Sequence, residues 1–146
     1  MKKVLVALLA VCAVGWATMA SGPLFGFGVE PVAGAAVSFD FGWAFDSWSI
    51  VGEKQSFDAW YGPWAVGALW NPDWGWAQGR VGLEFGWIWD PTGIYFEDLA
   101  FVLGAQRFWG VAGVYGQLEI GQSTYIIPKI GFVLQFDLPD GTEDGL

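Results

Sequence analysis

The chain has 146 residues, the length of a single domain. Hydrophobic residues make up 54% of it and aromatic residues 18%, but beyond residue 20 no apolar run reaches the roughly 20 residues of a membrane-spanning helix. Without Lys2 and Lys3, four basic residues remain against fifteen acidic ones, a net charge of −11. Such a surface repels the phosphate backbone, so the composition excludes a nucleic-acid-binding protein.

Residues 1–20 have the organisation of a secretory signal peptide. Lys2 and Lys3 give it a positively charged start, residues 4–15 are apolar, and small residues follow at the spacing of a cleavage site. We therefore expect cleavage before Ser21 and export of the rest of the chain. A retained membrane helix is the alternative, but the apolar run is short and no stop-transfer charges follow it.

The first half of the exported chain contains four segments in which apolar residues alternate with small or polar ones. This is the pattern of β-strands whose two faces differ. The segments cover residues 24–30, 33–46, 47–52 and 57–70. The second is very regular and places Phe39, Phe41 and Trp43 on one face. Residues 53–55, Glu-Lys-Gln, are expected to form a polar turn after the third segment.

The second half contains four further segments, over residues 77–90, 95–107, 111–121 and 124–138. The first of them has the clearest alternation in the chain, with Val81, Leu83 and Phe85 opposite glycines and charged residues. Turn sequences lie on both sides of it, Asn-Pro-Asp at residues 71–73 and Asp-Pro-Thr-Gly at residues 90–93. The connections are short throughout, which predicts antiparallel hairpins in an up-and-down meander.

The strand pattern predicts an all-β fold: a single antiparallel up-and-down transmembrane β-barrel over residues 21–138, with an acidic tail over residues 139–146. Residues 24–30 and 47–52 are the shortest segments, but we expect both to be strands. Six strands would make too narrow a membrane cylinder, whereas about eight is the usual minimum. We expect both ends of the exported chain on the periplasmic side.

The two faces of the strands decide between a soluble barrel, whose apolar face points inward, and an outer-membrane barrel, whose apolar face meets lipid. The other face here carries small residues and few charges, which suits a narrow interior better than a water-facing surface. We predict contact with lipid for Phe39, Phe41, Trp43, Val81, Leu83, Phe85, Trp87, Phe132, Leu134 and Phe136. We predict an interior charge network of Asp40, Arg80, Glu84, Gln117, Glu119, Lys129 and Gln135.

The tryptophans favour the membrane barrel as well. Aromatic girdles of such barrels lie at the two membrane–water boundaries, near the strand ends. Residues at or near the ends of the alternating segments include Trp43, Trp64, Trp70, Trp74, Trp76, Trp87, Trp89 and Trp109. Packing in the core of a soluble sandwich is the alternative role for these side chains.

These features together give the chain a resemblance to the small outer-membrane β-barrel proteins of the OmpA-barrel and OmpX type. The resemblance rests on the signal peptide, the alternating segments with tight turns, the aromatic-flanked apolar faces and the closing amphipathic segment. It covers nearly all of the exported chain, as a pattern and not as a residue motif. It departs at the C-terminus, because such proteins usually end on an aromatic residue, whereas Phe136 here is followed by ten residues.

The residue types in the chain argue against a catalytic site. The chain has no histidine, which excludes Ser-His-Asp and Cys-His sites and removes the commonest transition-metal ligand. Glu97 and Asp98 are adjacent carboxylates, but consecutive strand residues point to opposite faces, so we do not expect them to act as a pair. We expect no enzymatic activity and no catalytic, cofactor or metal site.

We therefore expect a structural or interaction role in the cell outer membrane. The lipid bilayer is the expected partner, and divalent cations or lipopolysaccharide are candidate partners of the acidic loops. A narrow channel for small solutes or hydrophobic compounds is one alternative. A soluble exported lipocalin-like barrel that binds an apolar ligand is another.

Overall fold

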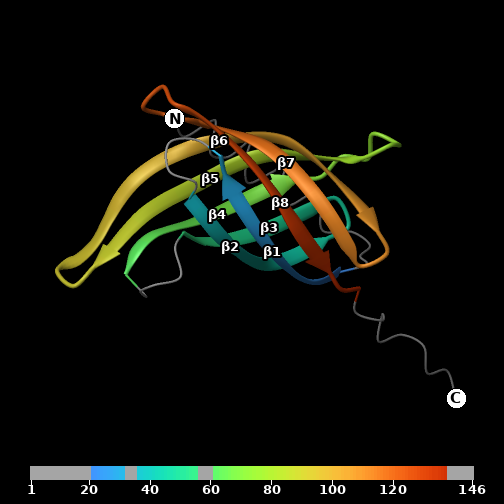
Figure 1. Ribbon diagram of the computed structural model, residues 1–146, viewed down its shortest axis with the longest axis horizontal. Helices are drawn as coiled ribbons and strands as arrows, with labels where there is room; N and C mark the ends of the chain where they lie inside the picture. Colours follow the sequence, from blue (N-terminus) through green and yellow to red (C-terminus); the bar gives the residue numbers. More distant parts are fainter. Residues whose placement is uncertain (1–20, 32–35, 56–60, 138–146) are drawn as a thin grey trace, which may run out of the picture.

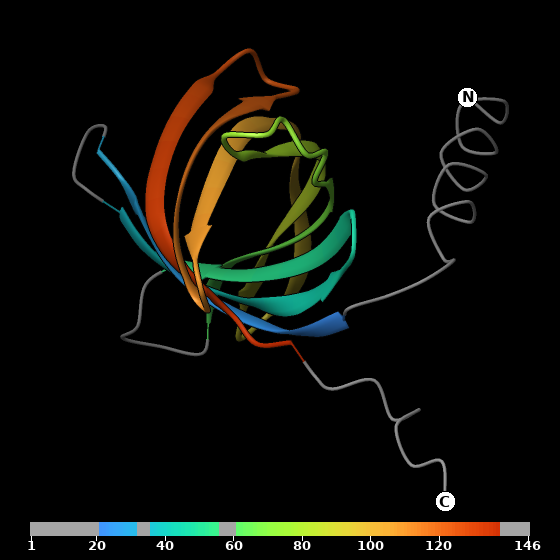
Figure 2. The same ribbon diagram turned by 90° about the vertical axis from the view of Figure 1, so that its right-hand side faces the viewer.

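The computed structural model describes residues 21–31, 36–55 and 61–137. These residues form a closed barrel of eight antiparallel strands (Figures 1 and 2). The strands are β1 (Ser21–Glu30), β2 (Ala36–Phe45), β3 (Trp48–Gln55), β4 (Gly62–Trp70), β5 (Gln78–Asp90), β6 (Gly93–Trp109), β7 (Ala112–Gly121) and β8 (Ile126–Gln135). Among the described residues, no helix has the length and hydrophobicity needed to cross a membrane. The expected signal peptide and acidic tail lie outside them.

Consecutive strands pair with each other, and β1 also pairs with β8. The closing ladder runs from Leu24 opposite Gln135 to Val29 opposite Ile130. Closure leaves no exposed sheet edge in the described barrel, and β2 has partners on both sides. The prediction of a closed, eight-stranded antiparallel meander is therefore confirmed, and its general shape is consistent with that of small outer-membrane barrels.

The strand boundaries differ from the sequence prediction most clearly at β3. The polar turn expected at residues 53–55 is wrong, because these residues continue the strand. Glu53 lies opposite Asp40 of β2 on one side and opposite Ala65 of β4 on the other. Residues 53–55 resemble a turn only by their polarity, and Glu53 is accommodated in the strand because its side chain points into a polar interior.

The even number of strands places the start of β1 and the end of β8 together at one end of the barrel, here called the terminal end. The turns at residues 46–47 and 110–111 lie there too. At the other end, here called the distal end, lie the turn at residues 91–92 and the segment at residues 122–125. The β5–β6 hairpin projects at this end, on the left of Figure 1. β7 pairs with β6 only from Ala100 onward, so residues 93–99 extend past it.

The barrel has most of its large apolar side chains on the outside. Phe39, Phe41, Trp43, Phe85, Phe132, Leu134 and Phe136 are exposed, and Val81, Leu83 and Trp87 are half-buried. The interior toward the terminal end contains a smaller apolar cluster of Leu24, Ala44, Val51, Leu69, Val102, Tyr115 and Val133. The other buried side chains are largely polar or charged, so the polarity is the reverse of that of a soluble barrel.

Two neighbouring strands approach closely at Gly42 of β2. A Cβ atom there would lie 2.0 Å from the Ile50 carbonyl oxygen and 3.0 Å from the Val51 Cα of β3. Both obstacles are backbone atoms, so no side-chain rotation could relieve the clash. Glycine at this position therefore permits the local spacing of β2 and β3.

We predict that Gly42→Ala lowers the free energy of unfolding by about 1–3 kcal/mol, the usual cost of overpacking. Gly116→Ala is the matched control, because a Cβ at that strand position would meet its nearest atom, Ile130 Cγ2, at 4.0 Å. The control should change stability by less than about 0.5 kcal/mol. Urea unfolding of the refolded protein, followed by tryptophan fluorescence, measures both. Equal effects of the two substitutions would contradict the close approach.

Candidate functional site

The polar interior begins near the terminal end with Arg80 of β5. Its Nε donates to Gln117 Oε1 at 2.8 Å, and its Nη1 donates to Gln106 Oε1 at 2.9 Å. The guanidinium carbon also lies 4.4 Å from the centre of the Tyr115 ring, a cation–π contact. Arg80 is 4% exposed, so these neutral partners replace the water that its charge would otherwise bind.

Tyr115 connects this arginine to β2. Its hydroxyl donates to Asp40 Oδ2 at 2.6 Å, and the Ser38 hydroxyl lies 3.5 Å from Asp40 Oδ1. The phenol thus contacts a cation with its ring and an anion with its hydroxyl. Tyr115 belongs to the apolar cluster too, and it therefore joins the apolar and charged parts of the interior.

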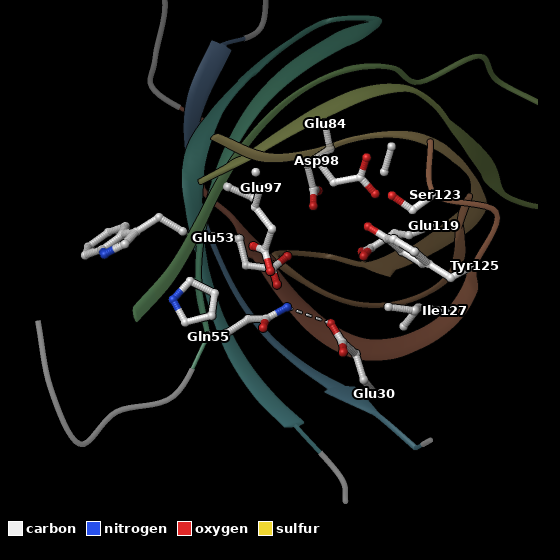
Figure 3. Close-up of a pocket in the computed structure, with 15 residues that line it drawn as sticks. Glu30, Glu53, Gln55, Glu84, Glu97, Asp98, Glu119, Ser123, Tyr125 and Ile127 are labelled. Carbon is white, nitrogen blue, oxygen red and sulfur yellow. Dashed lines mark hydrogen bonds between the residues drawn. The ribbon is translucent and has the colours of Figure 1, made fainter. Parts of the chain in front are cut away.

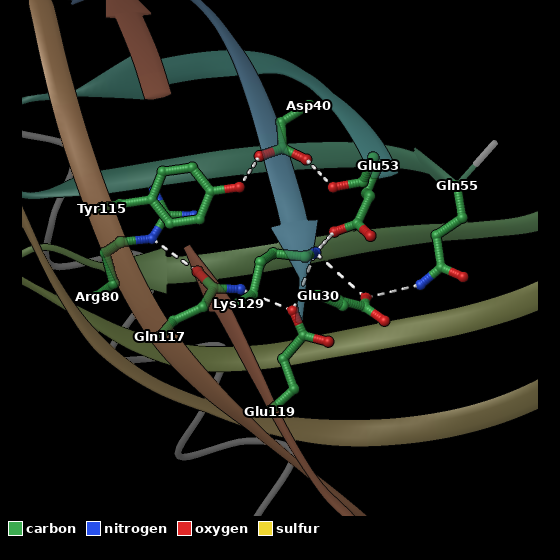
Figure 4. A network of polar contacts seen from close by, with 10 residues as sticks. Glu30, Asp40, Glu53, Gln55, Arg80, Tyr115, Gln117, Glu119 and Lys129 are labelled. Carbon is green, nitrogen blue, oxygen red and sulfur yellow. Dashed lines mark hydrogen bonds and ion pairs between the residues drawn. The ribbon is translucent and has the colours of Figure 1, made fainter. Parts of the chain in front are cut away.

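Lys129 of β8 is the centre of the remaining network (Figure 4). It is 1% exposed. Its ammonium group forms ion pairs with Glu53, with Glu119 at 3.1 Å and with Glu30 at 4.0 Å. Gln117 Nε2 donates to Glu119 Oε1 at 2.8 Å and so links this group to Arg80. These contacts join β8 to its neighbours β1 and β7 and to β3, which is not its neighbour in the sheet.

The structure joins five of the seven residues assigned to the interior by sequence into this arrangement: Asp40, Arg80, Gln117, Glu119 and Lys129. Glu84 points into the interior without a hydrogen bond or ion pair among the described residues. Gln135 is half-buried near the end of β8. The sequence pattern did not identify Glu30, Glu53, Gln106 and Tyr115. Glu53 was missed because only the register between β2 and β3 shows that it lies opposite Asp40.

A cavity of about 340 Å³ lies in the distal half of the barrel (Figure 3). We call it the acidic chamber, because its lining includes the carboxylates of Glu30, Glu53, Glu84, Glu97, Asp98 and Glu119. No lysine or arginine is among its lining residues in the described part of the chain. The chamber therefore concentrates negative charge, with Lys129 paired to three of its carboxylates.

A β-bulge brings two of these carboxylates together. Gly86 of β5 lies opposite Asp98 and Trp87 lies opposite Phe96, so Glu97 is an extra residue of β6. Alternation predicts that Glu97 and Asp98 point to opposite faces, but both line the chamber. A Cβ on Gly86 would lie 3.7 Å from Glu97 Oε2, which places this carboxylate beside Gly86. The expectation of opposite faces is therefore wrong.

Asp98 is held by donors from its own strand and from the segment after β7. Oδ1 accepts the backbone N–H of Leu99 at 2.7 Å. The Tyr125 hydroxyl also donates to this carboxylate, and the backbone N–H groups of Gln122 and Ser123 interact with it. Asp98 is 7% exposed, so these donors replace solvent around its charge.

Three of the chamber carboxylates lie close to one another. Glu53, Glu84 and Glu119 each place one oxygen within 4.8 Å of the oxygens of the other two. They come from β3, β5 and β7, so only the closed barrel brings them together. Such oxygen atoms can hold a hard cation or share protons, and they lack the neighbouring nucleophile and base that an acyl-transfer site requires.

No protein-family model matches the chain, and neither a curated protein nor a solved structure shows significant similarity to it.

We predict that Lys129→Met lowers the free energy of unfolding by about 3–5 kcal/mol, because it leaves buried carboxylates without their cation. Adding Glu53→Gln should recover part of this loss, with a coupling of about 0.5–3 kcal/mol. Arg107→Met is the control, since Arg107 is an exposed cation outside the interior. Urea unfolding of the unsubstituted protein, the two single interior variants, the double variant and the control tests the network. Strictly additive effects of the two interior substitutions would contradict it.

Proposed function

We propose that this protein is a small outer-membrane β-barrel with a structural or interaction role, anchored in lipid by its outer surface. One observation carries the proposal: large apolar side chains cover the outside of the barrel while charged side chains fill the inside. Soluble monomers rarely expose a continuous apolar surface of more than a few hundred Å². A bilayer is the environment in which this arrangement is favourable.

The exposed apolar side chains lie on all sides of the barrel. They include Phe25 and Phe27 of β1, Ile50 of β3, Val66 of β4, Phe101 and Leu103 of β6, Leu118 of β7 and Phe132 of β8. Lipid contact for these residues and for the lipid-facing set named from the sequence follows from the proposal. The strands are 8 to 17 residues long, which suits the roughly 9–11 residues of a tilted membrane strand.

Exposed tryptophans lie toward both ends of the barrel. Trp70, Trp74, Trp76 and Trp109 are near the terminal end. Trp89, Tyr61 and Tyr95 are exposed near the distal end. Two groups of aromatic side chains on either side of an apolar belt correspond to the girdles of membrane barrels. This distribution supports an orientation with the barrel axis across the bilayer.

The filling of the interior favours an interaction role over a channel. The apolar cluster and the Arg80 contacts lie below the acidic chamber of the distal half. A second cavity of about 320 Å³ lies at the terminal end, beside Gln78 and Gln106. A chamber that is closed at one side by packed residues offers a binding surface and no continuous path. Candidate partners are cations or lipopolysaccharide-bound cations, as proposed for the acidic loops.

A lipocalin-like function requires an apolar interior, and the described chamber is lined by six carboxylates. The exposed aromatic side chains lie on the outer face of the sheet, where they cannot contact a ligand inside the barrel. The OmpA and OmpX resemblance therefore remains the better guide, at the level of general shape.

We predict that the native protein sediments with the membrane fraction, resists extraction by salt and alkali, and is released by detergent. A folded barrel of this kind should also migrate differently on a gel before and after boiling in sodium dodecyl sulfate. Planar-bilayer recordings should show no stable conductance. Recovery in the aqueous fraction without detergent would end the membrane proposal, and a reproducible single-channel conductance would favour the channel alternative.

We predict that Leu83→Arg costs about 2–4 kcal/mol of stability in lipid vesicles, because it places a charge on the outer face near the middle of β5. Ile94→Arg is the control, since Ile94 is 68% exposed in the projecting hairpin, and should cost about 0–1 kcal/mol. Urea unfolding in vesicles measures both values. A negligible cost at Leu83 would be inconsistent with lipid contact there.

A further inference from the structure

We propose that the cavity of about 320 Å³ at the terminal end, here called the terminal cavity, binds the headgroup of a phosphoethanolamine lipid. Arg107 holds the phosphate group and Asp73 holds the ammonium group. The proposal rests on the membrane location proposed above, and it names one chemical class of lipid for one place on the barrel. The site is separate from the acidic chamber, which lies in the distal half.

The terminal cavity lies where the pairing of β5 with β6 ends. The last pair is Gln78 opposite Gln106, and β6 continues beyond it to Trp109. The loop at residues 71–77 contributes the other wall and projects at the terminal end, on the right of Figure 1. Gln106 is buried, whereas Arg107 is exposed. Both residues line the cavity, so it reaches from the inner rim of the barrel to the outer surface.

The first argument is an exposed cation at this end of the barrel. Arg107 is the only exposed lysine or arginine in the described part of the chain, and it forms no ion pair there. Its guanidinium carbon lies 5.5 Å from the centre of the Trp109 ring, a cation–π contact. An arginine beside an exposed tryptophan near a strand end suits the level of the lipid headgroups. The planar guanidinium matches the oxygens of a phosphate group.

The second argument is an opposite charge on the same cavity. Asp73 lines it without an ion pair to Arg107. Asp73 Oδ1 accepts the backbone N–H of Gly75 at 2.7 Å, which orients the carboxylate and leaves it further acceptor capacity. In phosphoethanolamine a two-carbon linker separates the phosphate from the ammonium group, a span of about 4–5 Å at ordinary bond lengths. One zwitterionic headgroup can therefore satisfy both side chains.

The neutral lining supports the same ligand. Gln78 Oε1 accepts from Gln106 Nε2 at 3.1 Å, and this bond orients the Gln78 amide. The NH₂ group of that amide has no partner among the described residues, so it can donate to a phosphate oxygen. Trp76 is 67% exposed and lines the cavity too. Its ring offers an apolar surface for the glycerol and the upper part of an acyl chain.

The two charges select among phospholipid headgroups. The headgroup of phosphatidylglycerol has no cation for Asp73 and would place its phosphate beside a carboxylate without compensation. Choline carries the same charges as ethanolamine, but its three N-methyl groups replace every N–H donor and enlarge the cation. A primary ammonium group has three N–H donors for a carboxylate. Phosphatidylethanolamine therefore fits the terminal cavity better than either of the other lipids.

The test uses the refolded protein in vesicles that contain equal amounts of phosphatidylethanolamine, phosphatidylcholine and phosphatidylglycerol. The protein is extracted into an uncharged detergent, and native mass spectrometry counts the lipid molecules that remain bound. We expect one phosphatidylethanolamine molecule per barrel. Its retention should exceed that of each other lipid by about fivefold, the contribution of one further ion pair at a surface.

The variants separate the two halves of the headgroup. Arg107→Gln should lower lipid retention by about tenfold or more, because it removes the charged donor to the phosphate. Arg107→Lys keeps the charge without the planar donor group and should give an intermediate retention. Asp73→Asn should remove the preference for ethanolamine over choline. Asp46→Asn is the matched control, at an exposed turn of the terminal end outside the cavity, and should keep this preference. Heat-modifiable migration verifies that each variant is folded.

Four results would overturn the site: equal retention of the three lipids by the unsubstituted protein, unchanged retention by folded Arg107→Gln, the same lipid preference in Asp73→Asn and Asp46→Asn, or displacement of the lipid by inorganic phosphate. The last result would assign the cavity to free phosphate. These outcomes are distinguishable from failure of the proposed function. A protein recovered without detergent loses the membrane location whatever lipid it retains, and an embedded barrel without a lipid preference loses only this site.

Discussion

The pairing of β1 with β8 is the constraint on which the rest of the structure depends. Once the sheet is closed, strand alternation assigns every side chain either to the interior or to the outer surface. The interior of an eight-stranded barrel is narrow, so the buried cations Lys129 and Arg80 lie within reach of partners on other strands. Lys129 does so with three glutamates, and Arg80 does so with two glutamines and a tyrosine ring. Closure thus turns a set of scattered polar residues into a connected network.

The interior is not balanced in charge along its axis. Arg80 lies toward the terminal end among neutral partners, while the carboxylates gather in the distal half around and beyond Lys129. Lys129 forms ion pairs with three of them. The apolar cluster below it limits the interior to a chamber. The same arrangement therefore underlies the proposed role without a pore.

Two local irregularities create the chamber. The bulge at Glu97 adds a carboxylate on the inner side next to Asp98, and the extension of β3 through Gln55 brings Glu53 beside Asp40. Both depend on pairing with a neighbouring strand. A bulge is defined by two residues that face one, and a strand boundary by where the partner's hydrogen bonds end. Neither can be read from the alternation of a single segment.

The sequence by itself determined the fold class, the strand number and the difference between the two faces, because a two-residue period is a local property of the chain. It also grouped Arg80, Gln117, Glu119 and Lys129 on one face. Only the tertiary structure decided which of these residues meet, since the register between strands distant in sequence fixes those distances. The acidic chamber, too, was decided only by the tertiary structure. Its carboxylates come from five strands, and only the closed barrel brings them together.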